Sequence, residues 1–106
     1  MKQIQPAAAG PSPSADPSQA LFQVISDLRS ADEAARFLGD LCTPQELQAM
    51  AARWQVVRLL AEGIHYQAIA ERTGASTATI SRVSSWLRFG TGGYRAMLDR
   101  WYEAGR

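Results

Sequence analysis

The sequence has very few of the residues that build disulfides, metal sites and nucleophilic active sites. Among 106 residues there is one cysteine, Cys42, and one histidine, His65. A single cysteine excludes an intrachain disulfide, so nothing in the sequence indicates an oxidising compartment. His65 has no second histidine or cysteine at metal-ligand spacing, and there is no glycine-rich nucleotide loop. We therefore predict that the protein is not an enzyme and uses no metal or cofactor.

Long apolar runs are also missing. No stretch of about 18 consecutive apolar residues occurs, which argues against a membrane-spanning helix. The N-terminus has Lys2, no apolar segment and four prolines before residue 18, a pattern unlike a signal peptide. We expect no membrane partner and a cytoplasmic location.

The excess of either charge is small, but it is unevenly distributed. The chain has 11 basic and 10 acidic residues, a net charge of +1. Residues 1–50 hold three basic groups against six acidic ones, and residues 51–106 hold eight against four, which gives −3 and +4. A positive half is typical of a nucleic-acid-binding region. Because the excess is modest, we expect moderate affinity with a marked dependence on salt.

The remaining composition predicts one all-α domain after a short tail. Residues 1–17 are rich in proline, alanine and serine and lack aromatic residues, so they are predicted to be a flexible tail. Residues 18–106 then form a single domain. Apolar residues recur there at steps of three and four, and no alternation typical of strands appears. The predicted fold has six helices.

Capping residues predict where the first three helices begin and end. The first contains Leu21 and Leu28, and the second runs from a capping box at 30–33 to Gly39, which would end it. Thr43 is the predicted N-cap of a long third helix, with Pro44 at its first and Glu46 at its third position. This helix reaches about Glu62 and is closed by Gly63. The predicted buried stripe of this long helix is Leu47, Met50, Ala51, Trp54, Val57, Leu60 and Ala61.

The segment 66–82, YQAIAERTGASTATISR, has the spacing of a DNA-reading helix-turn-helix. Small Ala70 fits where two helices cross, and Gly74 can adopt the positive φ of a sharp turn. Ile80, with Ile69 and Val83, would fix the second helix to the domain. We predict helices over 66–73 and 77–89, a break at 90–93 and a last amphipathic helix. The alternative is an ordinary antiparallel helix pair joined by a glycine turn.

The predicted helices carry more apolar surface than a domain of this size can bury. The side chains most costly to expose are Phe22, Phe37, Trp54, Trp86 and Trp101. We therefore predict that the N-terminal helices pack against a second copy of the chain. A two-fold homodimer would also place two reading helices roughly 34 Å apart, one turn of DNA.

From about Leu41 to Leu98 the sequence resembles the Trp repressor superfamily, and more closely its bacterial YerC/YecD-type branch. The resemblance covers a little over half of the chain. It implies a six-helix fold, an intertwined homodimer and a transcription regulator. It rests on the segments 41–44 (LCTP), 52–53 (AR), 62–63 (EG) and 73–82 (TGASTATISR), followed by a glycine-containing break and GY at 93–94.

The resemblance places DNA contacts at the start of the second helix of the motif. Ser76, Thr77 and Ala78 would face base edges and phosphates, Ser81 would follow one turn later, and Gln67 would bond a phosphate. Either Ser76 or Thr77 could instead serve only as the helix N-cap. The residue types on the outer side of this helix add Arg82, Ser85 and Arg88 to these positions. The predicted DNA face is Gln67, Ser76, Thr77, Ala78, Ser81, Arg82, Ser85 and Arg88.

In the Trp repressor, the corepressor tryptophan lies between two arginines. The matching residues are Arg53 and Arg82, and Thr43 and Thr79 match further ligand-lining positions. Val83 replaces a glycine that lets the indole approach, and Trp86 replaces a small serine that binds the ligand amine. We predict that Val83 and Trp86 fill this corepressor-like pocket, so that tryptophan is not required.

The two arginines then need another role. Their stems would pack on Trp86 and Trp54 while their heads pair with Glu46 or Glu71, or Arg82 would contact a phosphate. The sequence thus predicts a homodimeric, sequence-specific DNA-binding regulator, a repressor by resemblance, whose partners are double-stranded DNA and itself. The alternative is a helical protein–protein adaptor that keeps the fold but not DNA binding. No effector is specified.

Overall fold

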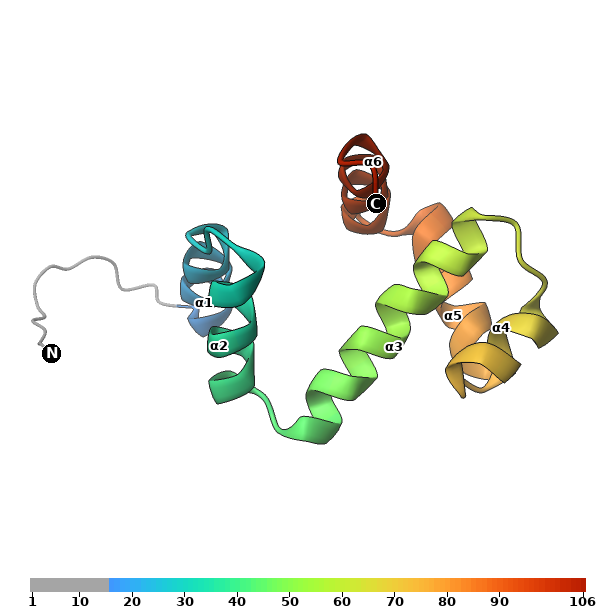
Figure 1. Ribbon diagram of the computed structural model, residues 1–106, viewed down its shortest axis with the longest axis horizontal. Helices are drawn as coiled ribbons and strands as arrows, with labels where there is room; N and C mark the ends of the chain where they lie inside the picture. The colour runs from blue at the N-terminus through green and yellow to red at the C-terminus, as the bar shows by residue number, and fades with distance from the viewer. Residues whose placement is uncertain (1–15) are drawn as a thin grey trace, which may run out of the picture. The chain divides into compact units, whose positions relative to one another are not determined.

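A computed structural model describes residues 16–106, and all regular structure in this range is helical (Figure 1). The all-α prediction is confirmed. Residues 1–15, most of the predicted tail, lie outside the described residues. The six helices found between residues 16 and 106 are α1 (Pro17–Ser26), α2 (Ala31–Leu41), α3 (Pro44–Ala61), α4 (Tyr66–Thr73), α5 (Thr77–Phe89) and α6 (Gly93–Glu103).

The helices fall into two units, with α1 and α2 in the first and α3 to α6 in the second. None of the helices described over residues 16–106 is long and apolar enough to cross a membrane.

Helix α1 ends at Ser26, so Leu28, which was predicted to lie in this helix, comes after it. Helix α2 begins as predicted but ends later. The Ser30 hydroxyl accepts a hydrogen bond from the backbone N–H of Glu33 at 3.0 Å, and the Glu33 carboxylate accepts one from the N–H of Arg29 at 2.9 Å. The predicted end at Gly39 is wrong, because α2 continues to Leu41. Glycine ends a helix when it adopts the left-handed conformation, and Gly39 is not among the glycines with positive φ. Its helical conformation costs only about 1 kcal/mol relative to alanine.

The first unit has no core of its own. No residue of α1 or α2 is buried. Leu21, Phe37 and Leu38 are half-buried, whereas Val24 and Ile25 are exposed and Phe22 exposes 60% of its surface.

Helix α3 is held at both ends by the predicted residues. The Thr43 hydroxyl accepts from the N–H of Glu46 at 3.1 Å, and the Glu46 carboxylate accepts from the N–H of Thr43 at 2.8 Å. This reciprocal pair satisfies two backbone donors at the helix start. At the other end Glu62 is the C-cap and Gly63 has a φ of 79°.

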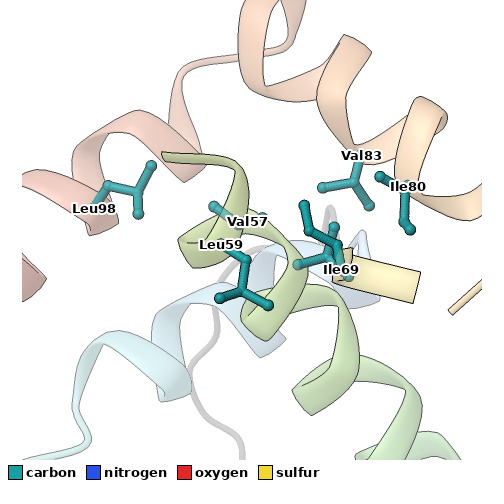
Figure 2. Packing of buried hydrophobic residues seen from close by; sticks show 7 residues of the cluster. Val57, Leu59, Ile69, Ile80, Val83 and Leu98 are labelled. Atoms are coloured by element: carbon teal, nitrogen blue, oxygen red, sulfur yellow. The ribbon is translucent and has the colours of Figure 1, made fainter. Parts of the chain in front are cut away.

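The core of the second unit lies around the C-terminal end of α3 (Figure 2). In Figure 1, α4 and α5 lie beside this end of the helix, and both contact it. Figure 2 shows Leu98 approaching from α6. The buried hydrophobic side chains are Val56, Val57 and Leu59 of α3, Ile69 of α4, Ile80 and Val83 of α5, and Leu98 of α6.

The predicted buried stripe of α3 is partly wrong. Val57 is buried as expected, but Met50, Ala51 and Ala61 are exposed, whereas Val56 and Leu59, which lie outside the predicted stripe, are buried. Apolar residues occur on all sides of the C-terminal half of α3, so periodicity does not single out one face. The contacts with α4, α5 and α6 decide which residues are buried.

The tight end of α5 provides a test of the packing. A Cβ atom added at Gly90 would lie 2.5 Å from the backbone carbonyl oxygen of Trp86. We expect Gly90→Ala to lower the free energy of unfolding by about 1–3 kcal/mol, because the backbone must shift. Urea denaturation at fixed protein concentration measures this change.

Gly93→Ala is the matched control, because its Cβ would meet only the Thr91 hydroxyl at 3.9 Å. This control should change stability by less than about 0.5 kcal/mol. Equal midpoints for the two variants would contradict the packing described for Gly90.

Candidate nucleic-acid interface

Helices α4 and α5 are joined by a tight turn centred on Gly74. Gly74 has a φ of 76° and a ψ of 0°, and its N–H donates to the carbonyl of Ala70 at 2.9 Å. The left-handed turn predicted for this glycine is confirmed. His65 lies at the other end of α4 as its N-cap, and its Nδ1 accepts from the N–H of Gln67 at 3.4 Å.

The Thr73 hydroxyl holds the turn together. It donates to the carbonyl of Ile69 at 2.8 Å and accepts from the N–H of Ala75 at 3.1 Å. One side chain therefore joins the last turn of α4 to the residue after Gly74. Sequence reasoning missed this role, although a hydroxyl directly before the turn glycine is a signal that could have found it.

The Ser76 hydroxyl caps α5 and is engaged twice. It accepts from the N–H of Thr79 at 3.1 Å and donates to the hydroxyl of Thr79 at 3.1 Å. The N–H of Ile80 bonds the carbonyl of Ser76 at 3.0 Å and starts the helical ladder. The backbone N–H groups of Thr77 and Ala78 in the first turn are therefore left without intrahelical acceptors.

Helix α5 has a buried inner face and an exposed outer face. Ile80 and Val83 are buried against Ile69, as the sequence predicts, and this packing fixes the helix to α3 and α4. All eight residues of the predicted DNA face are exposed. Their contact with DNA stays a prediction.

The arginines on this surface are not neutralised within the protomer. Over residues 16–106 the one ion pair is that between Arg36 and Asp32 on α2. Arg72 on α4 and Arg82 and Arg88 on α5 are exposed. Residues 42–106 hold eight arginines against five acidic groups, a net charge of +3. The surface is therefore available to an anionic partner.

The predicted pairing of Arg53 and Arg82 with Glu46 or Glu71 is wrong within residues 16–106, and the packing of their stems on tryptophans stays a prediction. The guanidinium groups that lie over an aromatic ring there are those of Arg58 and Arg106, at 4.8 and 5.0 Å from the centroid of Trp101. Arg53 and Arg82 are exposed and pair with neither glutamate proposed for them. The capping bond from the N–H of Thr43 to Glu46 Oε1 holds this carboxylate at the start of α3.

The tryptophans also pack differently from the sequence expectation. Trp101 of α6 lies edge-on to Trp54 of α3, with ring centroids 6.0 Å apart and an interplanar angle of 76°. This geometry is favourable for aromatic pairs. The contact joins the last helix to the long one.

The positions of the corepressor-like pocket are split between α3 and α5. Thr43 is the N-cap of α3, and Arg53 is exposed on that helix. On α5, Val83 lies in the core, Thr79 is half-buried and bonded to Ser76, and Trp86 exposes 52% of its surface. Trp86 is therefore not enclosed within one protomer, and the filling of this pocket stays a prediction.

Metal-binding groups are absent from the described part of the chain. No three histidine, cysteine, aspartate or glutamate side chains between residues 16 and 106 are placed to hold a metal ion. Cys42 is partly buried and unpaired.

Comparison with known proteins identifies related sequences and structures. The family model described as Trp repressor protein matches residues 17–102. The uncharacterized protein YerC of Bacillus subtilis strain 168 is 49% identical over 80 residues, which is 76% of this chain and 77% of YerC. The family match includes α1, further toward the N-terminus than the motifs described from sequence.

Two crystal structures resemble this fold. A TrpR-like protein from Eubacterium eligens is 45% identical with a TM-score of 0.73, covering 77% of this chain and 84% of its own. A protein from Staphylococcus aureus assigned to the Trp repressors is 40% identical with a TM-score of 0.76, covering 81% and 86%.

Replacement of the turn hydroxyl tests the role of Thr73. Thr73→Val keeps the shape but removes both hydrogen bonds, so we expect a loss of about 1–2 kcal/mol in the free energy of unfolding. Thr91→Val is the control, because Thr91 lies in the exposed link 90–92 between α5 and α6, which is one residue shorter than the predicted break. Urea midpoints measured for both variants should separate. If they coincide, the Thr73 hydroxyl does not stabilise the turn.

Proposed function

The chain belongs to the Trp repressor protein family, and we propose that it is a homodimeric, sequence-specific DNA-binding transcription regulator. We propose further that it acts as a repressor, in the cytoplasm, without tryptophan as corepressor. The observation that carries this proposal is the two-faced helix α5, fixed on one side by Ile80 and Val83 and lined on the other by small polar residues. With α4 and the Gly74 turn, it makes a helix-turn-helix.

The outer face of α5 suits the major groove. Thr77, Ala78 and Ser81 are small, so the helix backbone can come close to base edges. The free N–H groups in the first turn of α5 attract phosphate oxygens. The Ser76 hydroxyl is already bonded to Thr79. We therefore assign Ser76 mainly to capping, and the base contacts to Thr77, Ala78 and Ser81.

Charged and polar side chains around the helix would contact the DNA backbone. Arg82 and Arg88 are exposed and have no carboxylate partner within residues 16–106. Gln67 is exposed near the start of α4. Hydroxyl groups read sequence loosely because they both donate and accept. DNA shape and bridging water would therefore contribute much of the specificity.

The bare first unit supports a homodimer. Helices α1 and α2 bury no residue, and burial of one side chain such as Phe22 is worth about 1.5–3 kcal/mol. We propose that a second copy covers these helices and that residues 18–106 act as one domain in that assembly. The second unit also exposes Trp86 and Phe89, the latter by 80%, so it offers apolar surface of its own.

Two side chains support independence from tryptophan. Val83 stands where the family resemblance calls for glycine, and its side chain is buried in the core. Trp86 stands where a small serine is expected. Both add bulk where a ligand indole and amine would lie. We assign no catalytic role to His65, which caps α4.

A charge substitution on the outer face tests DNA binding. Ser81→Glu places a negative charge toward phosphate, so we expect at least an about tenfold loss of affinity for duplex DNA. Ala104→Glu adds the same charge at the exposed end of α6 and should change affinity little. Fluorescence anisotropy with labelled DNA at several salt concentrations gives both values.

Binding should also weaken steeply as salt rises from about 50 to 200 mM. Equal effects of the two glutamates, or no DNA binding at low salt, would favour the adaptor function instead.

The dimer is tested on α1. Phe22→Glu should convert the protein to monomer or unfold it, because a charge replaces an apolar side chain at the proposed interface. Gln23→Glu adds the same charge at the neighbouring position and should leave the protein a dimer with the mass of the wild-type assembly. Size-exclusion chromatography with light scattering reports the mass of each. A wild-type monomer at micromolar concentration would overturn the dimer.

A further inference from the structure

The second unit has a hollow that shares only Arg88 with the proposed DNA face. Its volume is about 530 Å³, which is within the range of small-molecule sites. It lies where the end of α3, the start of α4, the second half of α5 and the start of α6 meet. None of the six corepressor-like positions lines it. The hollow is therefore a separate candidate site.

The wall of the hollow combines apolar and cationic side chains. Leu60, Ile64 and Leu87 are half-buried members of the hydrophobic core's periphery and form its apolar part. Arg88 from α5 and Arg95 from α6 stand at its edge, and no aspartate or glutamate lines it. Neither arginine has a carboxylate partner within residues 16–106. Two uncompensated guanidinium groups favour an anionic ligand.

A buried hydroxyl supplies a third, directional element. Ser84 is only 7% exposed and lines the hollow. The hydrogen bonds formed by side chains of residues 16–106 do not include its hydroxyl. The Ser84 Oγ is not among the fully buried atoms of residues 16–106 that lack a partner, so it remains accessible from the hollow. A ligand oxygen there could accept its hydrogen bond.

We propose that this hollow binds a small organic acid, a carboxylate or phosphate monoester carried on an apolar body. The anion lies between Arg88 and Arg95, the Ser84 hydroxyl bonds it or a neighbouring polar atom, and the body packs on the apolar wall. A DNA phosphate could bond the arginines and the Ser84 hydroxyl but would make no use of the apolar wall. The combination therefore favours a small molecule over the DNA backbone.

Ligand binding at this place would act on the reading helix. The wall includes residues from all four helices of the second unit, so a bound molecule ties α5 to α3 and α6. Binding of the ligand would then change the affinity for DNA, and binding of DNA would change the affinity for the ligand by the same factor. This coupling rests on the proposed DNA-binding function, whereas ligand binding itself does not.

Titration of the full-length protein followed by amide NMR tests the site directly. The probes are benzoate, phenyl phosphate and hexanoate, with benzyl alcohol and hexanol as uncharged counterparts. We expect saturable shifts at Ile64, Ser84 and Leu87 with at least one anion, and about tenfold weaker binding of its uncharged counterpart. Arg95→Gln should weaken anion binding by about tenfold, and Ser84→Ala by less.

Arg100→Gln is the control, because Arg100 is exposed on α6 and does not line the hollow. The absence of saturable shifts at these amides with all three anions up to about 10 mM would overturn the proposal, since a site of this kind should hold such fragments in the millimolar range. Equal binding of charged and uncharged probes would also overturn it.

DNA measurements on the same variants separate this proposal from the proposed function. If Arg95→Gln lowers DNA affinity and leaves anion binding unchanged, the arginine serves the DNA backbone and the ligand site fails. If anions bind but DNA affinity stays the same with and without them, the site stands and its coupling to DNA fails. If the wild-type protein binds the anions but does not bind DNA, only the DNA-binding function is refuted.

Discussion

The packing of Ile69, Ile80 and Val83 against the end of α3 is the interaction on which the second unit depends. These side chains lie in a core of seven buried hydrophobic residues. Because Ile80 and Val83 take up one face of α5, the opposite face must point to solvent. The orientation of the outer face is therefore set by burial and not by any residue on that face. A reading helix needs this kind of rigid placement, since base contacts depend on exact geometry.

One chain alone provides a hydrophobic core for the second unit but not for the first. The second unit has a core, reciprocal capping on α3, and a turn held by Thr73 and Gly74. The first has well-capped helices but no buried residue. Two isolated short helices are marginal in water. A dimer that covers α1 and α2 would thus join folding to assembly, and it would present two copies of α5 to successive turns of DNA.

Local features were predictable from sequence, and features set by tertiary contacts were not. The Thr43–Glu46 capping box and the Gly74 turn depend on neighbouring residues, so their spacing alone predicted them correctly. The end of α2 was predicted wrongly because Gly39 does not adopt the positive φ with which a glycine ends a helix, and the helix continues to Leu41. The Thr73 bridge, the stacking of Arg58 and Arg106 on Trp101 and the hollow bounded by Ser84 and Arg95 were missed. The stacking of Arg58 on Trp101 and the hollow join segments that are distant in sequence, and a single sequence carries no signal for them. The Thr73 bridge and the stacking of Arg106 are local.

The central claim is that α5 reads DNA in a two-fold pair without tryptophan. Selection of bound duplexes from a random DNA pool, with the purified full-length protein at low salt and no added amino acid, tests it most directly. The account predicts enrichment of a two-fold-symmetric site whose half-sites lie about one helical turn, roughly 34 Å, apart. No enrichment, or enrichment that appears only when tryptophan is added, would contradict it.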